Sequence, residues 1–162
     1  MSEPTASLEE TPETVELSEE LNNNAEQLHG VPVTDSRGQL VLHPSAGSYH
    51  DLIELLVEEG YDVCIDLCGA DYLGNGTRGL PASVEPERFE LIVNLLDVRT
   101  PRRLRIRVQV PESEPMVATI SGIHPGAEAM EREASDMFGL CFEGHPDPTP
   151  ILLPDGWEGH PL

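Results

Sequence analysis

The chain has 162 residues, enough for one domain and a tail, and carries 30 acidic residues against nine arginines and no lysine, for a formal net charge of −21. So acidic a protein is a poor ligand for a nucleic-acid backbone or an anionic membrane, because both need a cationic surface. No stretch approaches the roughly 20 apolar residues of a membrane span, so we expect no direct membrane span. Neither an export signal nor a disulfide framework is visible, so we expect the protein to reside in a reducing compartment.

Residues 1–30 differ in composition from the rest of the chain. Nine of the 30 acidic residues and none of the arginines fall within residues 1–36, where large apolar side chains are few. Such a segment cannot bury enough surface to offset its chain entropy, so we predict an acidic disordered tail, with a short helix over residues 18–28 as an option. The tail can keep the protein in solution or serve as an acidic interaction arm, and the first role is favoured.

Turn and cap residues predict a hairpin and a helix at the start of the domain, which is expected to cover residues 31–140. Two short apolar runs flank the turn sequence at residues 35–38, an arrangement typical of a β-hairpin. A helix is expected over residues 48–59, because leucines recur at helical spacing and a glycine follows. Ser48 and Asp51 resemble a capping box at its start.

Three further strands are predicted between residues 61 and 110. The first covers residues 61–72 and precedes a long loop rich in glycine and proline. The other two cover residues 89–97 and 102–110, and they are expected to pair as a second hairpin. Alternation in the first of these strands puts Val63, Ile65 and Leu67 on one face and Cys64, Asp66 and Cys68 on the other.

The strand over residues 102–110 has one apolar face and one cationic face, the latter formed by Arg103, Arg105 and Arg107 together with Gln109. Five of the nine arginines lie between residues 99 and 107. In a chain this acidic we expect them to be neutralised by carboxylates of the same chain, and an acidic partner is the alternative.

A second helix and an irregular segment complete the chain. The helix is expected over residues 126–138, where an apolar stripe follows one side and Glu128, Arg132 and Asp136 are spaced to form two ion pairs along another. Residues 141–162 are rich in proline and lack regular periodicity, yet they carry several apolar side chains. They are interpreted as an extended arm that lies over the domain or over another protein.

Together these elements predict an α+β fold with two layers. Short turns between the strands favour a mostly antiparallel sheet of four or five strands. Each helix has one apolar side, so the helices are expected to cover one face of the sheet, followed by the extended irregular C-terminal arm.

Two groups of metal-binding side chains have simpler explanations than a metal. Cys64 and Cys68 are too few for an iron–sulfur cluster, and packing explains them better. A second group could ligate zinc but matches no compact ligand spacing, so hydrogen bonding within the arm or contact with a partner is favoured for its members. These are Cys141, His145, Asp147 and His160.

Glu131, Glu133 and Asp136 have the chemistry of a general acid or base. No nucleophile with a partnered histidine accompanies them, and no glycine-rich phosphate loop follows a strand. A solvated or ion-paired helix face explains these carboxylates more simply, and contact with basic residues of a neighbouring protein is the alternative. The residues therefore predict no catalytic centre in this chain.

A longer pattern in the last third of the sequence is more specific. Its segments are Glu131-Arg132-Glu133, Asp136-Met137-Phe138-Gly139, Phe142-x-Gly144-His145-Pro146-Asp147 and Trp157-Glu158-Gly159-His160-Pro161-Leu162. In their order and spacing, and with upstream segments such as Ala70-Asp71-Tyr72, they resemble the C subunit, or 30-kilodalton subunit, of NADH:quinone oxidoreductase, respiratory complex I. The resemblance covers roughly residues 49–162.

The resemblance implies a core subunit of the peripheral arm of a proton-translocating enzyme. Such a subunit belongs to an enzyme but is itself non-catalytic, and it scaffolds the quinone module against the D (49-kilodalton) subunit. It binds no cofactor, whereas NADH, FMN, iron–sulfur clusters and quinone belong to the whole complex. The implied location is the cytoplasmic face of the plasma membrane, as a peripheral protein.

The resemblance also implies which residues form the family signature and contact neighbouring subunits. They are Glu131, Arg132, Glu133, Asp136, Phe138, Gly139, Phe142, Gly144, His145, Pro146, Trp157, Gly159, His160 and Pro161. The sequence departs from the family at Ala129, at residues 148–150 and in stopping at Leu162. These departures imply weaker contact with the neighbouring subunits, and the stop at Leu162 fits a fragment or a naturally shortened member equally well.

Two other functions stay open on the sequence alone. The chain could be the equivalent subunit of a related membrane-bound hydrogenase or of another dehydrogenase complex. It could also be a free-standing metal-dependent enzyme that uses His145, Asp147 and His160. The first alternative differs from a complex I subunit in the electron donor of the whole complex. The second differs from it because the isolated chain would bind a stoichiometric metal.

Overall fold

The computed structural model describes residues 27–76 and 78–162. The predicted tail and the optional short helix therefore lie outside the described residues up to residue 26. Gln27–Leu28 form strand β1, which pairs antiparallel with β2, so the optional helix is wrong at these two residues. The hairpin predicted around the turn at residues 35–38 is present as β2 (Val31–Ser36) and β3 (Gln39–Leu42).

The main sheet has six strands in the order β1-β2-β3-β6-β5-β4. All neighbouring strands are antiparallel except β3 and β6, which run parallel. The sheet is therefore mostly antiparallel, as predicted, with more strands than the expected four or five. The remaining main-sheet strands are β2 (Val31–Ser36), β3 (Gln39–Leu42), β4 (Val63–Asp71), β5 (Phe89–Asp97) and β6 (Arg102–Val110).

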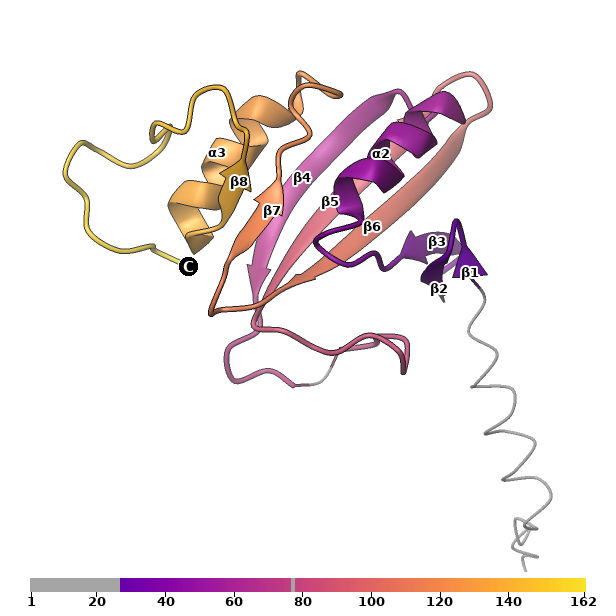
Figure 1. Cartoon of the computed structure of the whole chain (residues 1–162), viewed down its shortest axis with the longest axis horizontal. Coiled ribbons are helices and arrows are strands. Elements are labelled where there is room, and N and C mark those ends of the chain that lie inside the picture. Colours follow the sequence, from indigo (N-terminus) through magenta and orange to yellow (C-terminus); the bar gives the residue numbers. More distant parts are fainter. Residues whose placement is uncertain (1–26, 77) are drawn as a thin grey trace, which may run out of the picture.

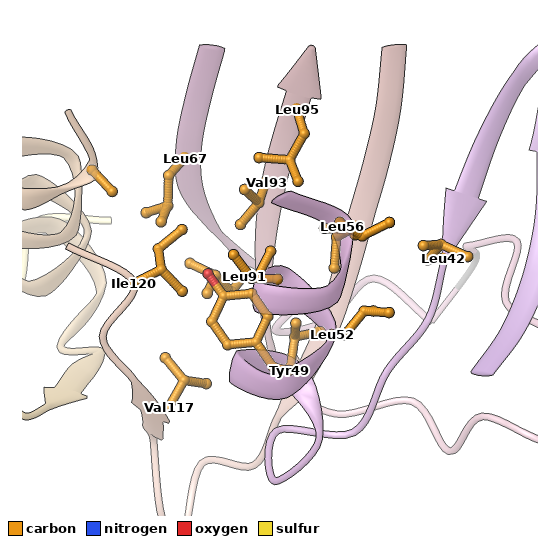
Figure 2. Packing of buried hydrophobic residues seen from close by; sticks show 14 of the residues in the cluster. Leu42, Tyr49, Leu52, Leu56, Leu67, Leu91, Val93, Leu95, Val117 and Ile120 are labelled. Atoms are coloured by element: carbon orange, nitrogen blue, oxygen red, sulfur yellow. The ribbon is translucent and has the colours of Figure 1, made fainter. Parts of the chain in front are cut away.

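Two helices cover one face of this sheet, which confirms the predicted α+β class. They are α2 (Tyr49–Glu58) and α3 (Ala127–Phe138), and α2 lies in front of β5 and β6 (Figure 1). Their buried side chains share one apolar cluster with alternate residues of β4, β5 and β6. Figure 2 shows Tyr49 of α2 in this cluster, with Val117 and Ile120 beside it.

A second, two-stranded parallel sheet joins β7 (Met116–Ala118) to β8 (Cys141–Glu143). β8 occupies the first three residues of the segment that the sequence predicts to be irregular. No helix in the described part of the chain has the length and apolar character needed to cross a bilayer.

A β-bulge near the start of β4 changes the predicted faces of this strand. The register with β5 shifts between Cys64 and Asp66, so Ile65 is an extra residue that lacks an opposite partner. Cys64 consequently packs against the apolar cluster together with Leu67, whereas Cys68 is exposed on the opposite face. The prediction that both cysteines share one face is wrong because simple alternation does not hold across a bulge.

The predicted capping box at the start of α2 is also wrong. Ser48 precedes the helix as expected, but its side chain makes no capping hydrogen bond. Its hydroxyl lies 2.9 Å from the Ser45 hydroxyl and bonds within the preceding turn instead. Asp51 remains in the first turn, where its charge favours the helix dipole.

We expect Gly69→Ala to destabilise the fold by about 2 kcal/mol, because the new methyl group would overlap a packed aromatic ring. A Cβ on Gly69 of β4 would lie 2.5 Å from Cδ2 of Phe138, which packs against the apolar cluster. Urea unfolding of the purified chain measures the loss. Gly122→Ala is the control, since a Cβ there meets nothing within 4 Å. Equal stability of the two variants would contradict the close contact between α3 and β4.

Candidate docking site

The signature residues gather where α3 meets the segment after β8. We define the C-terminal arm as residues 144–162, which contain no helix or strand. In Figure 1 the arm, in yellow, leaves β8, swings outward and returns to the C-terminal end of α3. The arm thus returns to α3, and hydrogen bonds with α3 side chains hold its backbone at several points.

Asp136 of α3 is the first of these anchors. Its Oδ2 accepts hydrogen bonds from the backbone N–H groups of Ile151, Leu152 and Leu153, at 2.9, 2.7 and 3.0 Å. The side chain is buried, and burial alone would raise its pKa, but the three donors and nearby Arg132 lower the pKa below its usual value. The ionised carboxylate is thus built into the junction between α3 and the arm.

Arg132, one turn earlier on α3, is the second anchor. Its guanidinium donates to the carbonyl oxygens of Thr149 and Pro150, at 2.8 and 3.2 Å, and to the Thr149 hydroxyl at 3.0 Å. The side chain makes its ion pair with Asp147 of the arm, at 3.5 Å. The predicted ion pairs along α3 are therefore replaced by contacts across to the arm, because the arm supplies better-placed acceptors.

Glu131 is completely buried, and its carboxylate fixes the segment that precedes α3 by accepting hydrogen bonds from it. Its carboxylate accepts from the backbone N–H of Ile120, at 2.8 Å, and from the Thr119 hydroxyl. Burial raises the pKa of Glu131, and these hydrogen bonds oppose that rise. The predicted solvated face is therefore wrong for Glu131 and Asp136, while Glu133 is exposed. The sequence did not predict the roles of Thr119 and Ile120, since a backbone N–H leaves no mark in a sequence and a single threonine hydroxyl does not reveal its partner.

His145, near the start of the arm, has a fixed tautomer. Its Nδ1 accepts from the Asp147 N–H at 3.1 Å, so Nε2 carries the proton and donates to the Glu128 carbonyl, also at 3.1 Å. The same Nε2 lies 3.7 Å from the Glu131 carboxylate. Both ring nitrogens are thus engaged within the chain.

The end of the arm rests on the last turn of α3. His160 donates from Nδ1 to the Asp136 carbonyl at 3.0 Å, and the Leu162 N–H donates to the Met137 carbonyl at 3.0 Å. Gly139 ends α3 in the left-handed conformation, and a Cβ there would lie 2.7 Å from the His160 ring. Glycine is therefore needed both for the turn and for the space that His160 occupies.

Gly139→Ala is expected to lower stability by about 2 kcal/mol and to free the end of the arm, because it adds a left-handed alanine and displaces His160. Gly156→Ala is a matched control, since Gly156 also has a positive φ but a Cβ there meets nothing within 4 Å. Hydrogen exchange at Leu162 and thermal unfolding report the two effects. Similar exchange at Leu162 in both variants would contradict the proposed close packing of His160.

The four residues considered as zinc ligands do not form one cluster. In the part of the chain that the structure describes, the group of potential ligand atoms close enough to hold an ion is His50, Asp51 and Glu54 on α2. The nitrogen atoms of His145 already bond within the chain, and His160 uses Nδ1 for the Asp136 carbonyl. The arrangement is that of hydrogen-bonding histidines in an irregular segment.

Although its backbone is held, the arm exposes large apolar side chains. Ile151, Leu152, Trp157 and Leu162 are between 42% and 65% exposed. Phe138 and Phe142 instead pack against the apolar cluster of the domain. Gly144, Pro146, Gly159 and Pro161 lie in exposed parts of the arm. The signature therefore divides into residues that fix the arm and residues that the arm presents outward.

Comparison with known proteins identifies the family. The family described as respiratory-chain NADH dehydrogenase, 30 Kd subunit, matches residues 42–162, which include both helices and the whole arm. The chain belongs to this family. The C subunit of NADH-quinone oxidoreductase from Bordetella petrii is 37% identical over 161 residues, covering 92% of this chain and 77% of that relative.

Two solved structures extend the comparison to the fold. The trypsin-resistant fragment (1-134) of Nqo5 is 28% identical, with a TM-score of 0.66, and covers 82% of this chain and 98% of the fragment. A chain of the membrane-bound sulfane sulfur reductase, an archaeal respiratory membrane complex, has a TM-score of 0.64 at 20% identity, covering 89% of this chain and 79% of that one. The second likeness shows a shared fold alone.

Proposed function

We propose that this chain is a non-catalytic core subunit of the peripheral arm of a proton-translocating NADH:quinone oxidoreductase. In this role its C-terminal arm docks on the D (49-kilodalton) subunit and helps to scaffold the quinone module. The supporting observation is the unusual state of the arm, in which the backbone is anchored by α3 while apolar side chains face solvent. A surface of this kind is typical of a docking segment.

The anchors favour docking because they reduce its entropic cost. A free 19-residue segment would lose conformational entropy when it met its partner. Arg132, Asp136 and the residues near Gly139 already restrict the arm, so its exposed side chains are presented in a preformed arrangement. The association is then driven by the burial of apolar surface.

The proposal assigns the electron-transfer chemistry to other subunits. NADH, FMN, the iron–sulfur clusters and quinone would be held elsewhere in the complex, and this chain would be a peripheral protein at the cytoplasmic face of the membrane. Its own buried carboxylates, Glu131 and Asp136, have hydrogen-bonding roles that involve the neighbouring backbone. Asp136 positions the arm, whereas Glu131 positions the backbone before α3 and lies 3.7 Å from His145 near the start of the arm.

The test is co-purification of the D subunit from native membranes with a tagged chain. We expect Leu152→Ser and Trp157→Ser together to reduce recovery of the D subunit about tenfold, because hot-spot aromatic and aliphatic contacts dominate such interfaces. Leu73→Ser is the control, since Leu73 is 70% exposed but lies in the loop after β4. Deleting residues 145–162 should abolish recovery. Undiminished recovery after this deletion would contradict the proposal.

A further inference from the structure

The sheet has a second face that the helices do not cover. Because α2 and α3 both pack on one side, alternate residues of β4, β5 and β6 point to the other side. Near the end of β6 this second face is partly closed by the loop after β4, where Arg107 donates to the Gly79 carbonyl at 2.9 Å. Nearer the start of β6, no helix or loop contact of this kind is found among the described residues.

The open part of this face forms two rows of side chains across three strands. One row is Val63, Leu96 and Arg103, and the next is Asp66, Asn94 and Arg105. Val63, Asp66 and Arg103 are exposed, and the others are half-buried. We call these six residues the open sheet patch. It combines apolar side chains with two arginines and a single carboxylate.

The arginines of the patch differ from most of the others in this chain. Arg88, Arg99, Arg102, Arg107 and Arg132 each form an ion pair with a carboxylate. In the part of the chain that the structure describes, Arg103 and Arg105 have no such pair, and Arg105 donates only to the Asn94 side-chain oxygen, at 3.0 Å. In a chain with 30 acidic residues, two neighbouring arginines are thus left with donors available to another molecule.

We infer that the open sheet patch docks a protein surface that carries carboxylates flanked by apolar side chains. This inference rests on the proposed function, since the partner would be a neighbouring subunit of the same complex. The guanidinium groups of Arg103 and Arg105 would bind the carboxylates, while Val63 and Leu96 would lose their exposed area on contact. Charge complementarity of this kind fixes register and partner choice.

The native thiol of Cys68 provides a reporter that requires no substitution in the chain. It is exposed on the same face, one row beyond Asp66, Asn94 and Arg105. Maleimide labelling of Cys68, quantified by peptide mass spectrometry, can be compared between the isolated chain and the assembled complex. We expect about tenfold slower labelling in the complex, because a docked subunit would cover the thiol.

Charge reversal tests the chemistry of the partner. Arg103→Glu should reduce recovery of the complex about tenfold, whereas Arg37→Glu, the same change in the β2–β3 turn, should leave it unchanged. Arg103→Gln should give an intermediate loss, and thermal unfolding of each isolated variant checks its fold. Equal recovery of the Arg103→Glu and Arg37→Glu variants would overturn the inferred partner.

The remaining outcomes separate the two proposals. If the chain co-purifies with its partners but Cys68 reacts at the same rate as in the isolated chain, the docking inference is overturned and the proposed function stands. If the isolated chain already protects Cys68, and deletion of residues 1–26 removes that protection, the chain's own acidic segment occupies the patch and the inference is likewise overturned. Failure to recover any partner would contradict the proposed function itself.

Discussion

Replacing Asp136 with alanine is expected to release the middle of the C-terminal arm from α3 and to cost about 3 kcal/mol of stability. Three backbone donors of the arm share one oxygen of this carboxylate, at 2.7 to 3.0 Å. A hydrogen bond to a charged group contributes roughly 1.5–3 kcal/mol, but bonds that share one acceptor are not additive. Hydrogen exchange of Ile151, Leu152 and Leu153 should therefore accelerate strongly, and recovery of the D subunit should fall with it.

Glu133→Ala is the matched control for this experiment, because it removes a carboxylate from the same helix at an exposed position. It should leave the exchange of the arm residues unchanged. Slow exchange at residues 151–153 in the Asp136→Ala protein would show that the arm is held by other contacts, such as those of Arg132.

The contribution of Asp136 to the stability of the fold should decrease at low pH. The pKa of Asp136 is lower in the folded chain than in an unfolded one, since the arm's N–H groups and Arg132 outweigh the effect of burial. Its ionised form therefore stabilises the fold above about pH 4, and this contribution is lost as the pH falls through the folded pKa. The stability difference between wild type and Asp136→Asn, measured by urea unfolding, should shrink on acidification below about pH 4. A difference that stays constant would rule out this linkage.

Glu131 should respond differently to two substitutions. Glu131→Ala is expected to cost about 3 kcal/mol, because it leaves the buried Ile120 N–H without an acceptor and opens a cavity. Glu131→Gln keeps an oxygen for that donor and removes a buried charge, so we expect it to be at least as stable as wild type at pH 7. Urea unfolding of both variants separates the hydrogen bond from the charge.

The sign of the pH effect at Glu131 is opposite to that at Asp136. Because burial raises its folded pKa, wild type should lose stability relative to Glu131→Gln as the pH rises above about 4 and through that folded value. The exposed Glu133 offers a comparison, since Glu133→Gln should not show the same trend. A Gln variant that is less stable than wild type at pH 7 would mean that the buried charge itself is required.

The regular elements could be predicted because their signals are local. The turn at residues 35–38, the alternation of β6 and the apolar stripe of α3 each depend on residues close in the chain. The family signature around α3 could also be recognised from the sequence, and the family comparison agrees with it. What the signature residues do could not be read in the same way.

The missed features depend on contacts between distant segments. Glu131 and Asp136 look like solvated carboxylates in the sequence, but their partners are backbone N–H groups at residues 120 and 151–153. The arm's apolar residues suggested docking, yet nothing in their order shows that α3 would hold their backbone. The bulge at Ile65 likewise depends on the register with β5, which no local pattern in β4 reveals.

The parallel pairing of β3 with β6 has a consequence for synthesis. Val41 and Leu42 pair with Arg105 and Ile106, more than 60 residues later, so the N-terminal hairpin leaves the ribosome long before the strand beside it exists. Leu42, fully buried in the finished fold, lacks its partner strand β6 during that interval. We therefore expect the hairpin to join last in folding, and a nascent chain that pauses before Ile106 to be the form most in need of a chaperone.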